Sequence, residues 1–250
     1  MSEDATQIVA AMTAKARASA RIVARASDAQ KAEALLAAAT ALRAAAPTIL
    51  KANAIDMEAG AANGLSAAML DRLKLDEGRI EGIASAVEQV AHLADPVGQV
   101  IDRSERPNGL VMERVRVPVG VLAIIYESRP NVTADAAALG LRSGNVVILR
   151  GGSEAVHSNR AIHAAMIEGI IKAGLPADAV QLVPTQDRAA VGALLKAQGQ
   201  IDMVIPRGGK SLVARVQDEA RVPVLAHLDG ICHTYIHAKA DPAMAEAIAV

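Results

Sequence analysis

The stretch from residue 117 to residue 153 most constrains how this chain can fold. It contains two uninterrupted apolar runs, residues 119–125 and 146–149, rich in β-branched side chains, as is typical of strands buried on both faces. Between them, Thr133 can cap a helix that ends at Gly144. Two buried strands joined by a helix form a right-handed parallel crossover. The sequence therefore predicts an α/β fold with a mostly parallel sheet.

The rest of the chain extends this pattern. Residues 1–95 favour helices, because alanine recurs throughout and Ser27, Ser66 and Asp76 stand where helix caps belong. After residue 118, strands and helices alternate, which predicts a doubly wound sheet. The expected strands are residues 120–126, 146–149, 179–183, 202–205, 222–226 and 231–236, and the expected helices are residues 133–143, 154–173, 187–196 and 209–219. A last helix should begin after Asp241.

Residues 98–117 interrupt the helices and strands with a predicted β-hairpin. Residues 97–102 and 111–117 alternate between apolar and polar side chains, and Pro107-Asn108-Gly109 supplies the turn. One face of this hairpin is apolar and the other is charged. It could pair with another subunit, or it could be an ordinary surface hairpin, and the sequence alone favours neither.

Composition excludes several classes of function. The chain has 250 residues, of which 52% are hydrophobic, and its net charge of −1 gives no reason to expect binding to nucleic acid or to an anionic membrane. It has no Trp, no Phe and two Tyr, so it lacks an aromatic platform for base stacking. A single Cys excludes an internal disulfide. Since the sequence shows neither a signal pattern nor a long uncharged run, we expect a soluble cytoplasmic protein.

Two glycine pairs, each preceded by an arginine, follow predicted strands. Open α/β sheets bind ligands at the carboxyl ends of their strands, and glycine lets the backbone approach an anion closely. The start of the following helix favours negative charge, and an arginine can make a forked contact with a phosphate. We therefore predict a phosphate-bearing ligand here, against the alternative of plain strand-to-helix turns. The candidate residues are Arg150, Gly151, Gly152, Ser153, Arg207, Gly208 and Gly209.

The segment after the strand at 120–126 offers candidates for substrate binding. Arg129 suits a carboxylate or a phosphate, and Ser128 or Asn131 could donate a hydrogen bond to an oxyanion. The alternative is that these residues only turn the chain.

Other patterns predict little. No G-x-G-x-x-G follows the early strands, and residues 208–211 resemble a P-loop end but have Val204 where that motif needs glycine. The spacing of His227, Cys232, His233 and His237 fits no common zinc site, so no metal is expected. Cys232 falls in a predicted buried strand, where cysteines are usually inert.

Five segments together carry a family resemblance: residues 54–73, 93–100, 116–155, 174–176 and 201–212. In them the chain resembles the gamma-glutamyl phosphate reductases (glutamate-5-semialdehyde dehydrogenases) of the aldehyde dehydrogenase superfamily. The resemblance implies NADPH-dependent reduction of L-glutamyl 5-phosphate to L-glutamate 5-semialdehyde, with release of phosphate, in proline biosynthesis. It implies a covalent mechanism in which a Cys thiolate attacks the acyl phosphate.

The resemblance also implies roles for residues. Arg150 with Gly151, Gly152 and Ser153 would meet the adenosine ribose and suits the 2′-phosphate of NADP. Ser128 stands where many aldehyde dehydrogenases place an oxyanion-stabilising Asn, with Asn131 as a nearby substitute. His227 lies near the position of a Glu base that aldehyde oxidisers use, and a reductase that releases phosphate does not need that base.

By the same resemblance, the nucleophilic Cys is expected after Val250 and not at Cys232, so these 250 residues alone should be inactive. The chain would divide into a helical part of the cofactor domain (1–97), an oligomerisation-type hairpin (98–117) and an NADP-binding α/β part (118–250), with the catalytic domain outside it. The expected partners are the small-molecule substrate and further copies of the chain, and a partnership with glutamate 5-kinase stays open. The rival hypothesis is a non-catalytic nucleotide-binding or assembly module on a dehydrogenase scaffold.

Overall fold

The structure is a computed structural model that describes residues 4–127, 129–226 and 232–249. At its centre is a parallel sheet of four strands in the order β5-β4-β3-β6. The strands are β3 (Val121–Tyr126), β4 (Val146–Arg150), β5 (Val180–Leu182) and β6 (Met203–Arg207). The predicted α/β class and mostly parallel sheet are confirmed.

Burial explains why β3 and β4 lie at the centre of the sheet. All six residues of β3 are buried, as are the first four of β4. A strand covered on both faces needs apolar side chains at every position, and both runs have them. In the register, Ile124 of β3 pairs with Leu149 of β4 on one side and Ile205 of β6 on the other.

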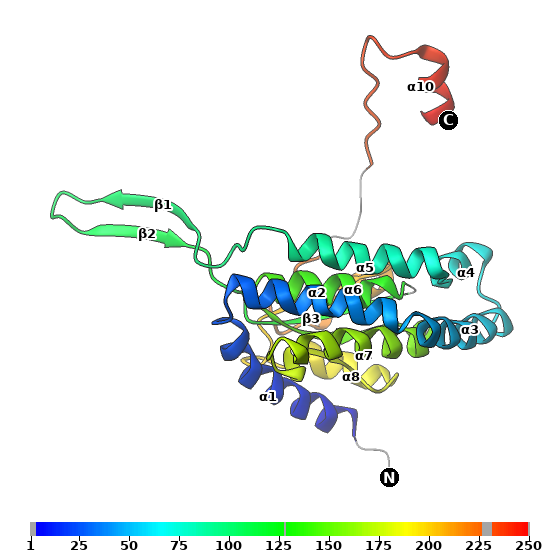
Figure 1. Cartoon of the computed structure of the whole chain (residues 1–250), viewed down its shortest axis with the longest axis horizontal. Helices are drawn as coiled ribbons and strands as arrows, with labels where there is room; N and C mark the ends of the chain where they lie inside the picture. The colour runs from blue at the N-terminus through cyan, green and yellow to red at the C-terminus, as the bar shows by residue number, and fades with distance from the viewer. Residues whose placement is uncertain (1–3, 128, 227–231, 250) are drawn as a thin grey trace.

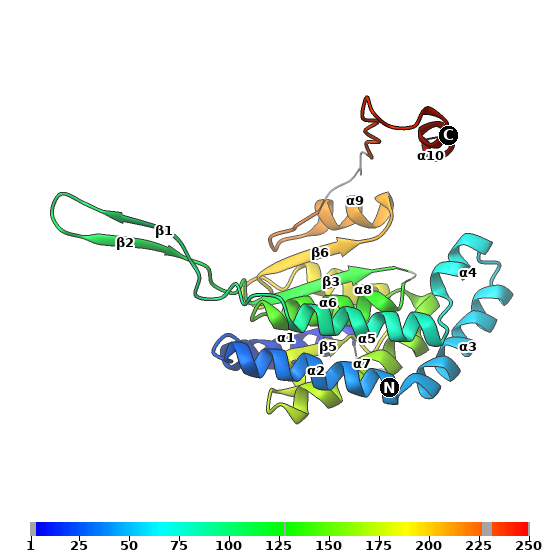
Figure 2. The ribbon, with the colours of Figure 1, turned by 45° about the horizontal axis from the view of Figure 1, so that its top comes forward.

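Helices cover both faces of the sheet, as Figure 2 shows. The first five helices are α1 (Ala5–Val23), α2 (Asp28–Ala44), α3 (Ala46–Ala62), α4 (Ala67–Leu73) and α5 (Glu77–Ala91). The later ones are α6 (Asn131–Arg142), α7 (Val156–Lys172), α8 (Arg188–Leu195), α9 (Lys210–Glu219) and α10 (Pro242–Ala249), with single 3-10 turns η1 (Ser153–Ala155) and η2 (Ala177–Ala179). Helix α6 packs on β3 and β4, α1 packs on β4 and α8, and α2 packs on α5 and α7.

The predicted caps at the first helices form. Ser27 Oγ accepts a hydrogen bond from the Gln30 backbone N–H at 3.1 Å, and Asp76 accepts one from the Arg79 N–H at 2.8 Å. Each satisfies a backbone donor that the first turn leaves without a partner. Helices α2 and α7 approach so closely that a Cβ on Gly169 would lie 2.1 Å from the backbone N of Ala38. Glycine is therefore required at position 169, where α7 crosses α2.

The hairpin projects away from the sheet and helices (Figure 1). Strands β1 (Val100–Glu105) and β2 (Val111–Val115) pair antiparallel, and all five residues of β2 are exposed. The first strand begins three residues later than predicted because Gly98 adopts a positive φ of 82°, which turns the chain before the ladder starts.

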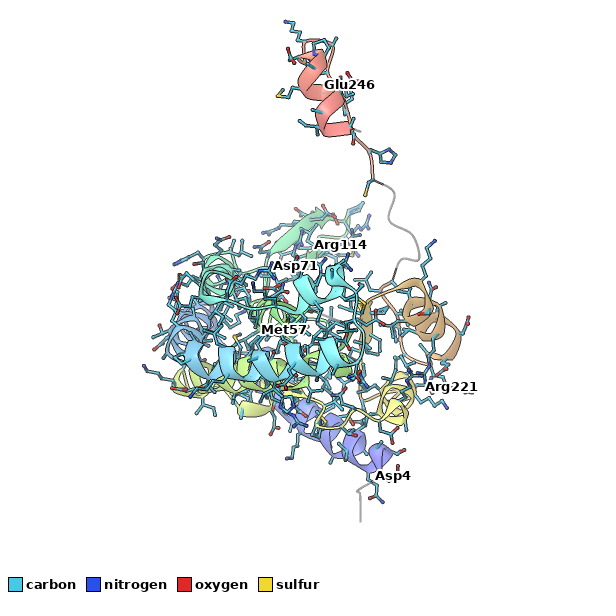
Figure 3. All side chains as sticks on the ribbon, turned by 90° about the vertical axis from the view of Figure 1, so that its right-hand side faces the viewer. Asp4, Met57, Asp71, Arg114, Arg221 and Glu246 are labelled. Atoms are coloured by element: carbon cyan, nitrogen blue, oxygen red, sulfur yellow. The ribbon has the colours of Figure 1, made fainter. Side chains whose placement is uncertain are left out.

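Two of the predicted strands were wrong. In residues 222–226 only Val224 forms a bridge, to Val204 of β6, and the described residues 232–236 form no strand. Leu225 and Tyr235 are exposed there, the latter by 84%. A buried strand would need its apolar side chains covered by neighbouring elements, and these two side chains are not covered. Residue 231 lies outside the described part of the chain. Helix α10, which carries Glu246, stands apart from the sheet and its helices (Figure 3).

Within the described residues, no single helix has the length and apolar composition that crossing a membrane requires. Helices α2 and α3 reach that measure only when taken together, and they are bent by 66° at the break between them.

Candidate functional site

A cavity of about 860 Å³ opens at the carboxyl ends of β3 and β4. Its walls come from α3, the 3-10 turn η1, the start of α8, the first turns of α9 and the ends of the two strands. This is the edge of an open parallel sheet at which ligands bind. The cavity is therefore where the predicted phosphate-binding residues should meet.

The first glycine bend lies at this cavity. Arg150, Gly152 and Ser153 line it, while Gly151 is buried beneath them. A Cβ on Gly151 would lie 2.3 Å from Asn159 Nδ2 and 3.0 Å from the Tyr126 hydroxyl. Only glycine lets the chain bend tightly over these two side chains.

The second glycine bend lies at the same edge of the sheet, on the other side of β3. The Glu127 backbone N–H donates to Arg207 O at 3.3 Å, and the Gly209 N–H donates to Glu127 Oε2 at 2.9 Å. Neither Arg207, Gly208 nor Gly209 is among the residues that line the cavity, although Ser211 of the helix that follows them is. The bend therefore contacts the cavity wall through Glu127, which lines it.

The guanidinium of Arg150 is held by backbone carbonyls. One terminal nitrogen donates to Gly151 O at 2.7 Å and the other to Gln186 O at 3.0 Å. Burial lowers the pKa of Arg150; the Glu154 carboxylate opposes this shift, and the positive charge of Arg188 adds to it. Because both terminal nitrogens already have partners, Arg150 is less free to fork around a phosphate than its sequence position implied.

Two buried polar atoms in this wall have no partner among the described residues. They are Arg150 Nε, a donor, and Gln186 Oε1, an acceptor, and both side chains line the cavity. Buried polar atoms in native proteins are nearly always hydrogen-bonded. The pair therefore fits a ligand that offers both an acceptor and a donor, such as a phosphorylated ribose.

Beneath the bend lies a buried chain of hydrogen bonds. The Tyr126 hydroxyl lies 2.7 Å from Thr133 Oγ1, which donates to Asn159 Oδ1 at 3.0 Å. Since the Thr133 hydroxyl has one proton, Tyr126 is the donor to it. Burial raises the pKa of Tyr126 to about 12, so the phenol stays protonated and the chain of bonds stays intact.

Two N–H groups at the start of α7 already have a partner within the chain. The sequence predicted that they would meet an anion, but the buried carboxylate of Asp56 on α3 accepts from the N–H groups of His157 and Ser158 at 3.1 and 2.7 Å. A carboxylate of the chain itself thus occupies this helix N-terminus. A phosphate in the cavity would therefore not be bound by the N–H groups of His157 and Ser158.

Arg129 and Asn131 line a different cavity, of about 460 Å³, together with residues of α4, α5 and α6. Asn131 Nδ2 donates to Asp135 Oδ2 at 2.8 Å. Ser128 lies outside the described residues. The described residues before and after it therefore line two cavities, with Tyr126 and Glu127 at the first and Arg129 and Asn131 at the second.

The single cysteine is not where the sequence placed it. Cys232 is exposed and belongs to no strand, so the expectation of a buried, inert thiol was wrong. His233 and His237 are also exposed, and His227 lies outside the described residues. Within the described ranges, no group of three His, Cys, Asp or Glu side chains could hold a metal ion.

Sequence reasoning missed several residues that line the first cavity, among them Asp56, Gln186 and Arg188. Gln186 and Arg188 follow the end of β5, so the rule that ligands lie beyond strand ends could have found them. They lack the Gly-Gly signal that marked the other two strand ends. Asp56 gave no such signal, because its role depends on a helix that begins 100 residues later in the chain.

The parallel sheet and the cavity at its carboxyl edge define an α/β protein of the dinucleotide-binding type. The chain belongs to the aldehyde dehydrogenase family, whose family model matches residues 1–250. Membership of this family implies a nicotinamide cofactor.

Several relatives are similar over almost the whole chain. A gamma-glutamyl phosphate reductase from Novosphingobium aromaticivorans is 67% identical over 248 residues, which are 99% of this chain and 58% of that protein. One from Sphingopyxis alaskensis is 69% identical over 247 residues, again 99% of this chain and 58% of that protein. The chain thus spans 58% of the length of these relatives.

A solved structure shows the same fold. The crystal structure of a gamma-glutamyl phosphate reductase from Thermotoga maritima superposes with a TM-score of 0.85 at 40% identity. The superposition covers 87% of this chain and 52% of that one.

Proposed function

We propose that this chain is the cofactor-binding part of an enzyme that reduces L-glutamyl 5-phosphate to L-glutamate 5-semialdehyde, with NADPH as reductant and release of phosphate, in proline biosynthesis. The observation that carries the proposal is 67% identity to a gamma-glutamyl phosphate reductase over 99% of the chain. The cavity at the carboxyl ends of β3 and β4 supports it, because its unpartnered polar atoms suit a phosphorylated ribose.

In this proposal the chain's own residues bind and orient the cofactor. Gly151 and Gly152 bring the backbone to the cavity wall, and Ser153 offers a hydroxyl beside them. The second bend, Arg207, Gly208 and Gly209, fixes the end of β6 against Glu127 and so places α9 at the cavity. When bound, NADPH supplies the hydride that the reduction requires.

The preference for NADP over NAD rests on positive charge near the first bend. Arg150 is partly neutralised by Glu154 and held by backbone carbonyls. Arg188, the first residue of α8, is exposed at the same cavity and takes part in none of the ion pairs among the described residues. We assign to Arg188 and Arg150 together the recognition of the ribose 2′-phosphate.

The covalent step is assigned outside this chain. In it, a thiolate attacks the acyl phosphate, a carbon–sulfur bond forms, and the carbon–oxygen bond to the leaving phosphate breaks. Cys232 is exposed and lines none of the described cavities, so we do not assign the nucleophile to it. We place the nucleophilic cysteine of the whole enzyme beyond Val250. Of the two candidates for the oxyanion donor, Ser128 lies outside the described residues, and Asn131 lines the second cavity and donates its amide to Asp135, so we favour Ser128.

The hairpin supports a proposal about assembly. Val100, Val111 and Val115 are exposed on a ribbon that projects from the body, which suits pairing with further copies of the chain. We also propose that a glutamate 5-kinase supplies the unstable acyl phosphate. A chain with one cysteine has no internal disulfide, which supports a cytoplasmic location.

The proposal is tested by measuring the thermal stability of the chain with and without NADPH. At one hundred times Kd, a ligand that binds only the folded state stabilises it by about 2.7 kcal/mol. Absence of any shift in a folded chain would favour the rival hypothesis of an assembly module.

A variant sharpens the test. Arg188→Ala should weaken NADPH binding about tenfold and leave NADH binding unchanged, since one charged hydrogen bond is worth about 1.5–3 kcal/mol. Arg21→Ala removes an exposed arginine that lines none of the described cavities and is the matched control. An equal loss for both nucleotides would contradict the assignment of Arg188.

A further inference from the structure

The second cavity, between α4, α5 and the start of α6, has charged side chains on an apolar wall. Leu75 and Ile83 are buried and form part of that wall. Arg129 and Asp135 line the same space from the segment after β3 and from α6. A cavity that combines apolar walls with a few polar groups is typical of a small-molecule site.

In the described part of the chain, the Asp135 carboxylate has no ion-pair partner. It is half-buried, and its only hydrogen bond among the described residues comes from the neutral amide of Asn131 at 2.8 Å. Burial raises its pKa, and the Asn131 hydrogen bond only partly opposes that shift. Other carboxylates that are partly covered do have cations: Asp95 pairs with Lys31 at 2.6 Å, and Asp202 pairs with Arg17 at 2.7 Å. A desolvated charge without a counter-charge is costly.

Positive charge is present in the same cavity but does not neutralise Asp135. Arg79 is paired with Asp71 at 2.8 Å. Arg72, Lys74 and Arg129 also line the cavity, are exposed, and join none of the ion pairs among the described residues. Among the described residues, the cavity thus keeps one unpaired carboxylate, Asp135, and a group of unpaired cations as separate charges. A zwitterionic ligand could satisfy both.

We propose that this cavity binds the amino-acid end of the substrate, with Asp135 accepting the α-ammonium group and Arg129 binding the α-carboxylate. The inference rests on the proposed function and adds to it the groups that recognise an α-amino acid. Because Glu127 lines the cofactor cavity and Arg129, two residues further along the chain, lines this one, a substrate held here by its amino-acid end can extend its other end toward the cofactor cavity.

The experiment uses the whole chain and two stable probes, L-glutamate and glutarate, which differ by the ammonium group. Binding is followed by NMR of the Ile83 methyl group, which lies in the cavity wall. We expect L-glutamate to bind the wild-type chain at least tenfold more tightly than glutarate. Asp135→Asn should abolish that preference and leave the affinity for glutarate within twofold. Arg129→Ala should weaken both probes about tenfold.

The matched control is Asp71→Asn, which removes a carboxylate of the same cavity that already has a cation and should keep the preference for L-glutamate. The melting temperature of Asp135→Asn at neutral pH reports on folding, and we expect it to equal or exceed that of wild type, because a buried charge without a counter-charge has been removed. Equal affinity of the wild-type chain for both probes, no binding of either, or an unchanged preference in Asp135→Asn would overturn the inference. If NADPH still stabilises the chain in those cases, the proposed function survives; if NADPH does not bind, the proposed function fails by its own test.

Discussion

Strands β3 and β2 are similar in length and both contain valine, yet β2 also carries a Glu and an Arg, and the surroundings of the two strands are opposite. All six residues of β3 are buried, whereas all five residues of β2 are exposed. Strand β3 has a parallel partner on each side and helices on both faces, while among the described residues β2 pairs with β1 alone. A two-stranded ribbon alone is marginally stable in water.

The comparison shows that strand propensity does not decide which strand stabilises the fold. Burial does: at about 25 cal/mol per Å² of apolar surface removed from water, β3 contributes to the core, and β2 contributes almost nothing until something covers it. Apolar side chains therefore have different roles in the two strands. In β3 they position the cavity edge, and in the hairpin they form an uncovered apolar surface.

The largest effect is expected in the sheet. Ile148→Ala in β4, at a fully buried position, should lower the free energy of unfolding by about 2–5 kcal/mol, because it leaves a cavity in the core. Val111→Ala in the exposed β2 should change it by less than about 0.5 kcal/mol. Urea denaturation of both variants measures the difference. Similar losses in the two variants would contradict the comparison.

An intermediate effect is expected at the amino end of the sheet. The Asp202 carboxylate accepts from Arg17 at 2.7 Å and from the Val121 N–H of β3 at 2.7 Å. Burial opposes ionisation, but these hydrogen bonds keep the pKa of Asp202 below its usual 3.8. A carboxyl group with a lowered pKa stabilises the fold above 3.8, and this contribution is lost as the pH falls through the folded value.

Asp202→Asn should therefore cost about 1 kcal/mol at neutral pH, and the cost should shrink in acid. Urea titrations of wild type and variant at neutral pH and in acid measure this loss in the free energy of unfolding. Glu113→Gln is the control, since Glu113 pairs with Arg103 across the exposed hairpin at 3.4 Å and such surface pairs contribute little. A cost for Asp202→Asn that does not depend on pH would show that the charge is not responsible.

We expect the smallest effect on the folded monomer for the double variant Val111→Lys with Val115→Lys. This variant also tests most directly what the exposed face of the hairpin does. It should change the free energy of unfolding by less than about 0.5 kcal/mol, because both side chains are already exposed. If the hairpin pairs copies of the chain, as we propose, sedimentation velocity should show self-association of the wild type that this variant lacks; a wild-type chain that stays monomeric would contradict that proposal. Ile22→Lys with Ile55→Lys adds the same charges at exposed positions of α1 and α3 and should leave assembly unchanged.

Much of the fold follows from local patterns. The runs at 119–125 and 146–149 could be read as buried strands because every position is apolar, and the caps at Ser27 and Asp76 form because their chemistry is local. The predictions of strands at 222–226 and 231–236 were wrong because a buried strand also needs neighbouring elements that cover its side chains. Tyr235, for example, is 84% exposed. Whether neighbouring elements cover a strand depends on residues far away in the sequence, so the local pattern could not reveal it.

The candidate site was likewise predictable only where local patterns determine it. The sequence could place Arg150 and Ser153 at a strand end, and both line the cavity. It could not show that Asp56 would cap α7, or that Arg150 would donate to Gln186, since these contacts join residues 101 and 36 positions apart. Nor could it show that Arg129 and Asn131 would line a different cavity from Arg150. Strand-end rules place residues at an edge, and packing decides which of them meet.

The contact between Asp56 and the first turn of α7 has a consequence for synthesis on the ribosome. Ser158 lies 102 residues after Asp56, and ribosomes add about 5–20 residues per second. For roughly 5–20 s, the emerging α3 carries a carboxylate whose donors have not yet been made. Until α7 has been synthesised, the N-terminal helices lack the helix on which α2 and α3 pack. During that interval their uncovered surfaces are accessible to proteases and chaperones.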